Sequence, residues 1–171
     1  MSFTFKPISQ ADVWAFAAWR YQPPYDVYNE PPPEEGAADY LAYFLEPDYH
    51  FHAVYDERDE LVAVCSFGPD GQVPGGDYRA EGLDIGLGVR PDLTGQGRGA
   101  EFVRATVDFA LTTFRPALLR VTIAAFNRRA CRVWQRAGFK QSQTFRRAED
   151  EMEFVILVRA VGNYSADLPE S

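Results

Sequence analysis

The sequence predicts an α/β (α+β) fold in which one mixed sheet carries helices on both faces. The chain has 171 residues, which is the usual size of one domain. It is 46% hydrophobic and 15% aromatic, which is enough for a packed core. β-rich runs also interleave with runs of helical period, and no internal repeat interrupts them. We expect a single domain at residues 1–160 and a C-terminal tail at residues 161–171.

The N-terminal elements follow from alternation and capping signals. Alternating phenylalanines predict a short strand at residues 3–7. Ser9 is typical of a helix N-cap, and Asp12 three residues later completes a capping pattern, so a helix is expected at residues 10–19. A second helix is expected to begin near Pro33, because proline is tolerated in a first helical turn.

The remaining elements are two helices and a series of strands, recognised by their different hydrophobic periods. A helix of residues 97–115 shows apolar spacings of three and four and stops before Pro116. Asn127 opens a further helix that ends at Gly138, where a left-handed cap belongs. Strands are expected at residues 50–55, 61–67, 83–89, 118–124, 139–145 and 152–159.

Charge is distributed unevenly along the chain. The net charge of −8 argues against a nucleic-acid partner, which needs an excess of Lys and Arg. Residues 1–60 hold three basic and twelve acidic side chains, whereas residues 90–147 hold twelve basic and three acidic ones. We therefore expect one surface for an anion and another for a cation, with solvated faces as the alternative.

Other protein classes are disfavoured. The chain has neither a basic leader nor an apolar run of membrane-spanning length, so we expect a soluble, cytoplasmic protein without a membrane partner. Cys65 and Cys131 lack the paired spacing of zinc or redox motifs and are expected in the core. His50 and His52 alternate on one strand but have no third ligand, so no metal site is expected.

A glycine loop at residues 89–100 carries the strongest functional signal. Gly95, Gly97 and Gly99 lie between a strand and a helix, and they remove side chains where successive amides can turn toward one ligand. The positive end of the following helix dipole also attracts an anion, so the loop suits a pyrophosphate. The loop is neither a P-loop nor a dinucleotide fingerprint, because their Lys and glycine spacings are missing. A tight turn that merely needs glycines is the alternative.

Residues 82–158 resemble the GNAT superfamily of acetyl-CoA-dependent N-acetyltransferases. The resemblance rests on Val89-x-Pro91, on Thr94-x-x-Gly97-x-Gly99, and on Asn127-x-x-Ala130-x-x-Val133-Trp134-x-x-Ala137-Gly138-Phe139. It implies acetyl-CoA as acetyl donor. It also implies a mostly antiparallel sheet with a V-shaped splay between the strands at residues 83–89 and 118–124.

The resemblance also implies which residues bind the cofactor. Backbone groups of Leu87, Gly88 and Val89 would meet the pantetheine arm, and Asn127 would lie at its far side. Trp134 stands where the family often has a tyrosine that protonates the departing thiolate; it is expected either in the core or along the cofactor arm. The loop that would receive the pyrophosphate consists of Thr94, Gly95, Gln96, Gly97, Arg98, Gly99 and Ala100.

Amine acetylation needs a proton acceptor for an ammonium and a donor for the thiolate. Asp84 is the preferred base, because strand alternation places it on one face with Gly86 and Gly88, and Glu81 lies just before the strand. A surface carboxylate is the alternative for Asp84. By family analogy the Val89 amide would stabilise the oxyanion. Water, or a tyrosine from elsewhere such as Tyr25 or Tyr28, would replace the missing acid.

The acceptor site is expected at the Tyr- and Pro-rich loop of residues 21–32. Tyr25, Tyr28 and Asp26 suit a cationic amine with apolar bulk, although the rings also suit the packing surface of a lid. The acceptor would be a small-molecule amine or a peptide N-terminus that attacks acetyl-CoA directly, and the protein would be a monomer or homodimer. The main alternative is a CoA-binding sensor or interaction domain with reduced catalysis; a nucleotide-binding module is less favoured.

Overall fold

The computed structural model describes residues 2–30 and 36–162. The expected helix start near Pro33 and most of the expected tail, residues 163–171, lie outside this part. Along the described chain the elements are β1 (Thr4–Pro7), α1 (Gln10–Ala17), η1 (Tyr25–Tyr28), α2 (Ala37–Phe44), η2 (Pro47–Tyr49), β2 (His52–Tyr55), β3 (Leu61–Phe67), η3 (Pro69–Gly71), β4 (Leu83–Val89), η4 (Pro91–Leu93), α3 (Gly99–Phe114), β5 (Leu118–Ala124), α4 (Arg128–Arg136), β6 (Lys140–Arg146) and β7 (Glu153–Ala160).

Most predicted boundaries are met within two residues. Ser9 caps α1 with its hydroxyl on the Asp12 amide, while the Asp12 carboxylate accepts from the Ser9 amide. Gly138 follows α4 with a φ of 96°, the left-handed conformation that the sequence predicts. β2 begins later than expected because His50 has a φ of 46° and closes η2 instead of extending the strand.

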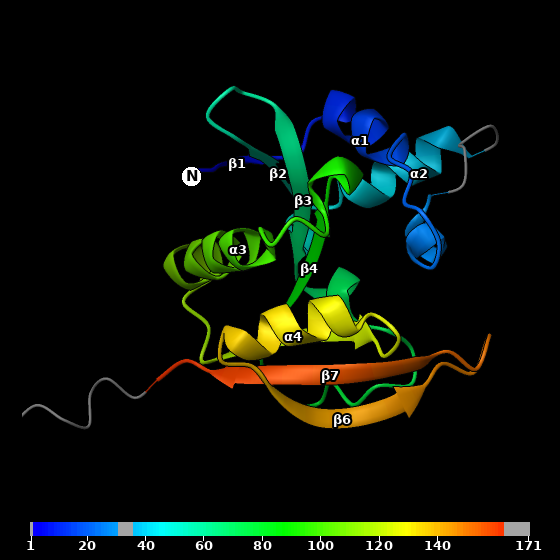
Figure 1. The fold of residues 1–171 in the computed structure, drawn as a ribbon, viewed down its shortest axis with the longest axis vertical. Helices are drawn as coiled ribbons and strands as arrows, with labels where there is room; N and C mark the ends of the chain where they lie inside the picture. Colours follow the sequence, from blue (N-terminus) through cyan, green and yellow to red (C-terminus); the bar gives the residue numbers. More distant parts are fainter. Residues whose placement is uncertain (1, 31–35, 163–171) are drawn as a thin grey trace, which may run out of the picture.

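The described strands form one seven-stranded sheet in the order β1-β2-β3-β4-β5-β7-β6. All neighbours are antiparallel except β4 and β5, which are parallel, as a mixed and mostly antiparallel sheet requires. In Figure 1, β3 and β4 run nearly vertically, whereas β6 and β7 run across beneath them. The two halves of the sheet meet where β4 touches β5.

Helices cover both faces of the sheet and enclose two apolar clusters. The larger cluster contains Phe102 and Val107 of α3 and Trp134 of α4, packed on one face. The smaller cluster, which includes Val13 of α1 and Phe44 of α2, covers the opposite face of the N-terminal strands. Within the described residues no helix is both long and apolar enough to span a bilayer.

The pairing of β4 with β5 is short. Only Leu83↔Leu119 and Asp84↔Arg120 are in register, after which the strands part. We call this the β4–β5 divergence, and it corresponds to the predicted V-shaped splay. On its other edge β4 pairs with β3 all the way from Ile85 to Val89. The second half of β4 therefore has a strand partner on one side only.

The backbone direction along β4 follows from its hydrogen bonds to β3. The Asp84 carbonyl accepts from Gly68, and the Arg90 amide donates to Val62, so even-numbered residues direct their backbone groups toward β3. In an antiparallel ladder the direction alternates. The amides and carbonyls of Leu87 and Val89 therefore face the divergence.

A buried ion pair lies where the divergence begins. The Asp84 and Arg120 side chains, 3% and 4% exposed, form two hydrogen bonds, Nε to Oδ1 at 2.6 Å and Nη2 to Oδ2 at 2.9 Å. The Gln72 amide donates to the same carboxylate at 3.0 Å, and Arg120 Nη1 donates to the Ala80 carbonyl at 2.9 Å. The pair thus holds the loop before β4 in place, and it does so at the last position where β4 and β5 are paired.

Asp84→Asn tests this role of the ion pair in stability. The amide leaves the Arg120 guanidinium buried without its counter-ion, which costs about 3–5 kcal/mol in such pairs. We expect Tm to fall by about 10 °C in a chain of this size. The matched control is Asp77→Asn, which removes an exposed pair with Arg79 and should leave Tm unchanged. Equal melting of the Asp84 variant and the unmodified chain would contradict the structural role.

Candidate active site

The glycine loop turns through two left-handed residues. Gly95 and Gly97 have φ values of 72° and 74°, a region that side chains disfavour. A Cβ at Gly97 would meet nothing within 4 Å, so this stretch of backbone is open on the outside. α3 begins two residues later at Gly99. An open, amide-rich turn at a helix N-terminus fits a diphosphate group.

Gly99 has a different reason to be glycine. A Cβ there would lie 3.1 Å from Cγ2 of Val133, so the missing side chain lets the start of α3 pack closely against α4. The sequence interpretation grouped Gly99 with the glycines that expose amides. The structure separates it from them, because the space beside Gly99 is filled by protein.

Side chains of the loop stabilise its shape. The Thr94 hydroxyl donates to the Pro91 carbonyl at 2.7 Å, so its one proton is used locally and not kept for a phosphate. The Gln96 amide donates to the Asp92 carbonyl at 2.7 Å. Arg98 is half-buried, lies 3.5 Å from Glu101 and stacks over Phe102. Ala100, in the first turn of α3, is exposed.

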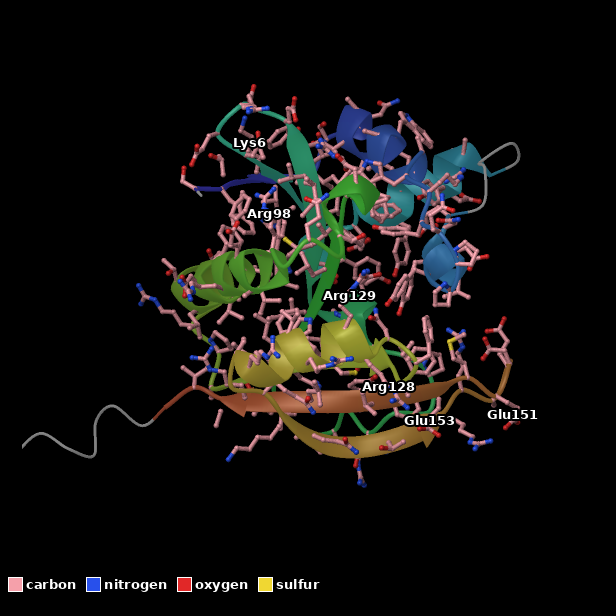
Figure 2. All side chains as sticks on the ribbon, in the orientation of Figure 1. Lys6, Arg98, Arg128, Arg129, Glu151 and Glu153 are labelled. Atoms are coloured by element: carbon pink, nitrogen blue, oxygen red, sulfur yellow. The ribbon has the colours of Figure 1, made fainter. Side chains whose placement is uncertain are left out.

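Arg129 brings positive charge from α4 to the glycine loop. Its guanidinium Nη1 lies 3.0 Å from the place of a Cβ on Gly95, and its Cζ lies 4.4 Å from the Tyr25 ring centroid. Figure 2 shows Arg129 on the upper side of α4 and Arg128 on the side toward β7. A cavity of about 400 Å³ opens beside Arg129, lined by Arg20, Tyr21, Gln22, Pro23, Tyr25, Pro91, Asp92, Thr94 and Arg129.

Tyr21 joins the aromatic loop to the edge of β4. Its hydroxyl donates to the Val89 carbonyl at 2.7 Å, and burial raises its pKa to about 12, so it stays a donor. Val89 and Leu87 are the backbone positions that face the divergence. Gly88, in contrast, is paired with Val64 and directs its backbone toward β3, so it offers the cofactor no backbone group. A Cβ on Gly88 would lie 3.3 Å from Cε2 of Phe16, so the missing side chain leaves room for that ring.

Tyr28 reaches the first turn of α4. Its hydroxyl accepts from the Asn127 side-chain amide at 3.2 Å, while the Asn127 carbonyl oxygen caps α4 through the Ala130 amide. Burial raises the pKa of Tyr28. Trp134 is only 6% exposed and packs edge-on against Phe139. Its burial favours the core interpretation over a place along the cofactor arm.

The predicted catalytic carboxylates have different surroundings. Asp84 shares a face with Gly86 and Gly88 as predicted, yet both of its oxygens are bound by Arg120 and it is 2% exposed. A fully engaged, buried carboxylate does not suit a proton acceptor. Glu81 is exposed in the loop before β4, and Asp26 is exposed on η1.

Sequence reasoning missed three residues beside β4, namely Ser66, Asp70 and Tyr43. Ser66 ends a buried strand and Asp70 belongs to a Pro-Asp-Gly turn, so both have an ordinary structural interpretation. The structure brings them together at Gly86. Among the described residues no group of three or more His, Cys, Asp or Glu could hold a metal ion.

The sequence matches the acetyltransferase (GNAT) domain family over residues 2–140. The chain belongs to this family. The predicted GNAT fold and acetyl-CoA-dependent N-acetyltransferase are thereby confirmed, with acetyl-CoA as acetyl donor. A search of curated proteins found no match.

Solved structures support the same fold. The spermidine N-acetyltransferase of Vibrio cholerae, in complex with CoA and spermine, superposes with a TM-score of 0.70 at 13% identity, covering 92% of this chain and 95% of that one. The aminoglycoside acetyltransferase AAC(6')-Ib, in complex with ribostamycin and coenzyme A, gives a TM-score of 0.74 at 16% identity, with 100% of both chains covered. At this identity the likeness establishes the fold alone.

The variants Gly97→Glu and Gly97→Gln test the glycine loop as an anion site. Both add equal bulk and equal strain at a positive φ, so both should weaken acetyl-CoA binding. Only Glu adds a negative charge near the diphosphate. We expect about tenfold weaker binding for Glu than for Gln, because repulsion between partly solvated charges is worth about 1–2 kcal/mol. Calorimetry at low salt measures the difference. Identical affinities of the two variants would place the diphosphate elsewhere.

Proposed function

We propose that the protein transfers the acetyl group of acetyl-CoA to a primary amine of a small cationic molecule by direct attack. The observation that carries the proposal is the β4–β5 divergence, where the backbone groups of Leu87 and Val89 point between two strands and pair with neither. The glycine loop and Arg129 lie beyond the end of β4 and suit the diphosphate. The divergence and the glycine loop follow each other along the chain, which suits an elongated cofactor.

The acceptor class is supported by charge and by the structural neighbours. The N-terminal 60 residues, which supply α1, α2 and the aromatic loop, carry four acidic side chains for each basic one. Tyr28 is 39% exposed, and its ring stacks with Phe126 at 6.0 Å, which offers aromatic faces to a cation. The two neighbours described above are complexes with spermine and with ribostamycin, both polycationic amines.

The chain supplies orientation and proton transfer. Acetyl-CoA, when bound, supplies the acetyl group as a thioester. Amides that face the divergence, above all that of Val89, are placed to stabilise negative charge on the acetyl oxygen. Tyr28 replaces the α4 tyrosine of the family: it approaches Asn127 from η1, and its raised pKa keeps the phenol protonated until a thiolate requires the proton.

A CoA-binding sensor is the second candidate. Two observations favour it, the buried Trp134 at the usual tyrosine position and the ion-paired state of Asp84. Such a protein would bind acetyl-CoA without passing the acetyl group to an amine. Its cofactor site would be indistinguishable from that of an enzyme, so only turnover separates the two functions.

A panel of amines distinguishes the enzyme from the sensor. Purified protein with acetyl-CoA should release free thiol when spermidine, spermine or ribostamycin is added, and mass spectrometry should detect the acetylated amine. A peptide with a free N-terminus extends the panel to the alternative acceptor. Acetyl-CoA binding without amine-dependent thiol release would support the sensor instead.

Tyr28→Phe tests the proton donor. The variant keeps the ring stack with Phe126 but removes the hydroxyl, so kcat should fall at least about tenfold while acetyl-CoA affinity is unchanged. Tyr55→Phe is the matched control, because its hydroxyl bonds Asp12 of α1 away from the divergence. Equal kcat values for the Tyr28 variant and the unmodified protein would assign the proton to water.

A further inference from the structure

A second carboxylate lies on the face of β4 that α3 does not cover. Asp70 belongs to η3, directly after β3, and both of its oxygens accept hydrogen bonds from neutral hydroxyls. The Ser66 hydroxyl donates to Oδ2 at 2.7 Å, and the Tyr43 hydroxyl of α2 donates to Oδ1. Over residues 2–30 and 36–162, no Lys or Arg forms an ion pair with Asp70. Its charge is oriented but not neutralised.

Gly86 explains how Asp70 comes so close to β4. The two strands place Gly86 opposite Ser66, and a Cβ on Gly86 would overlap the Ser66 hydroxyl oxygen. The same Cβ would lie 3.4 Å from Oδ2 of Asp70. The missing side chain therefore admits both groups against the backbone of β4. Gly86 lies two residues beyond Asp84, the last residue that pairs with β5, so Asp70 stands at the start of the divergence.

Asp70 and Asp84 thus lie on the same face of β4 but differ in burial and in ion pairing. Asp84 is enclosed and shares its charge with a guanidinium, while Asp70 is partly exposed and has only hydroxyl donors. Hydroxyl donors orient a carboxylate and leave its charge available to a cation. The next backbone position along β4 whose groups face the divergence is Leu87.

We propose that Asp70 is the catalytic residue that binds the ammonium group of the acceptor and takes its proton. This inference rests on the acetyl transfer proposed above. In the step, the bound ammonium first loses one proton to water, and the neutral nitrogen then bonds the acetyl carbon as the carbon–sulfur bond breaks. The second proton passes from nitrogen to the Asp70 carboxylate, and the sulfur leaves with the bonding pair and gains a proton from Tyr28. Asp70 then returns its proton to water, and Tyr28 recovers one from water.

The two protons that the nitrogen loses leave in a fixed order. An alkylammonium has no lone pair and a reference pKa of about 10.4, so the bound group must give one proton to water before it can attack. The Asp70 carboxylate holds the group in place during this loss. The second proton becomes transferable to Asp70 as the nitrogen lone pair enters the new bond, because the nitrogen then becomes far more acidic.

Glu30 adds negative potential beside Asp70. Burial raises the pKa of Glu30, and the nearby negative charge of Asp70 raises it further. A second carboxylate in reach of Asp70 adds to the attraction for a cation. An acceptor with more than one ammonium group satisfies both, which matches a polyamine or an amino sugar better than a monoamine.

The test compares Asp70→Asn with Asp108→Asn, an exposed carboxylate on α3 outside the site. Each variant is assayed for thiol release with spermidine and ribostamycin, for acetyl-CoA affinity by calorimetry, and for Tm. We expect kcat/KM of Asp70→Asn to fall about 100-fold with acetyl-CoA affinity and Tm unchanged, and Asp108→Asn to behave like the unmodified protein. Tyr43→Phe, which frees one oxygen of Asp70, should lower kcat with a smaller effect on the acetyl-CoA KM.

The outcomes separate the two proposals. If Asp70→Asn keeps kcat/KM within threefold of the unmodified protein, Asp70 is not the proton acceptor, while acetyl transfer stands. If the unmodified protein binds acetyl-CoA but acetylates neither amine nor the peptide, the proposed function fails and the role of Asp70 fails with it. Should Asp70→Asn lose stability, Asp70→Glu decides, because it keeps the charge: recovery of kcat/KM supports the proposal, and equal loss at an unchanged Tm overturns it.

Discussion

The buried pair of Asp84 and Arg120 decides where the sheet stops being continuous. Parallel β4 and β5 share only two registered positions, and the ion pair occupies the second. Beyond it, the backbone groups of Leu87 and Val89 point away from β3 and have no strand to bind. Buried backbone groups need partners, so this edge of β4 is suited to a ligand with amide groups of its own. The pair itself need not add net stability, since desolvation offsets much of the attraction; its role is to fix the position of the divergence.

Charge around the divergence is divided between the two helix layers. Arg129 and the open glycine turn form the positive end, beyond the C-terminus of β4. Asp70 forms the negative end on the opposite face, close to where β4 leaves β5. In the proposed reaction, the anionic cofactor and a cationic acceptor are therefore drawn to different ends of β4.

Much of this arrangement was predictable from local sequence patterns. Strands β3, β4 and β5 begin and end at the predicted residues, because their apolar runs are bounded by turn residues or a proline. The glycine loop and the Asn127 cap were also predictable, since both depend on neighbouring residues alone. Pairings across the sheet were not: Arg120 lies 36 positions from Asp84, and nothing local marks the two as partners. Asp70 was missed for a related reason, because Pro-Asp-Gly is an ordinary turn until Gly86 and Ser66 are known to face it.

The aromatic loop then couples the two sides of the divergence. Tyr21 donates to the Val89 carbonyl on β4, Tyr28 accepts from Asn127 on α4, and the two rings meet edge to face at 6.4 Å. A carbonyl oxygen has two lone pairs, so Val89 can keep the Tyr21 hydrogen bond and accept a second one from a ligand amide. The loop therefore need not leave when the cofactor arrives. In the proposed reaction it forms one wall of the filled site and keeps the Tyr28 phenol beside Asn127, so that Tyr28 supplies the acid in place of the buried Trp134.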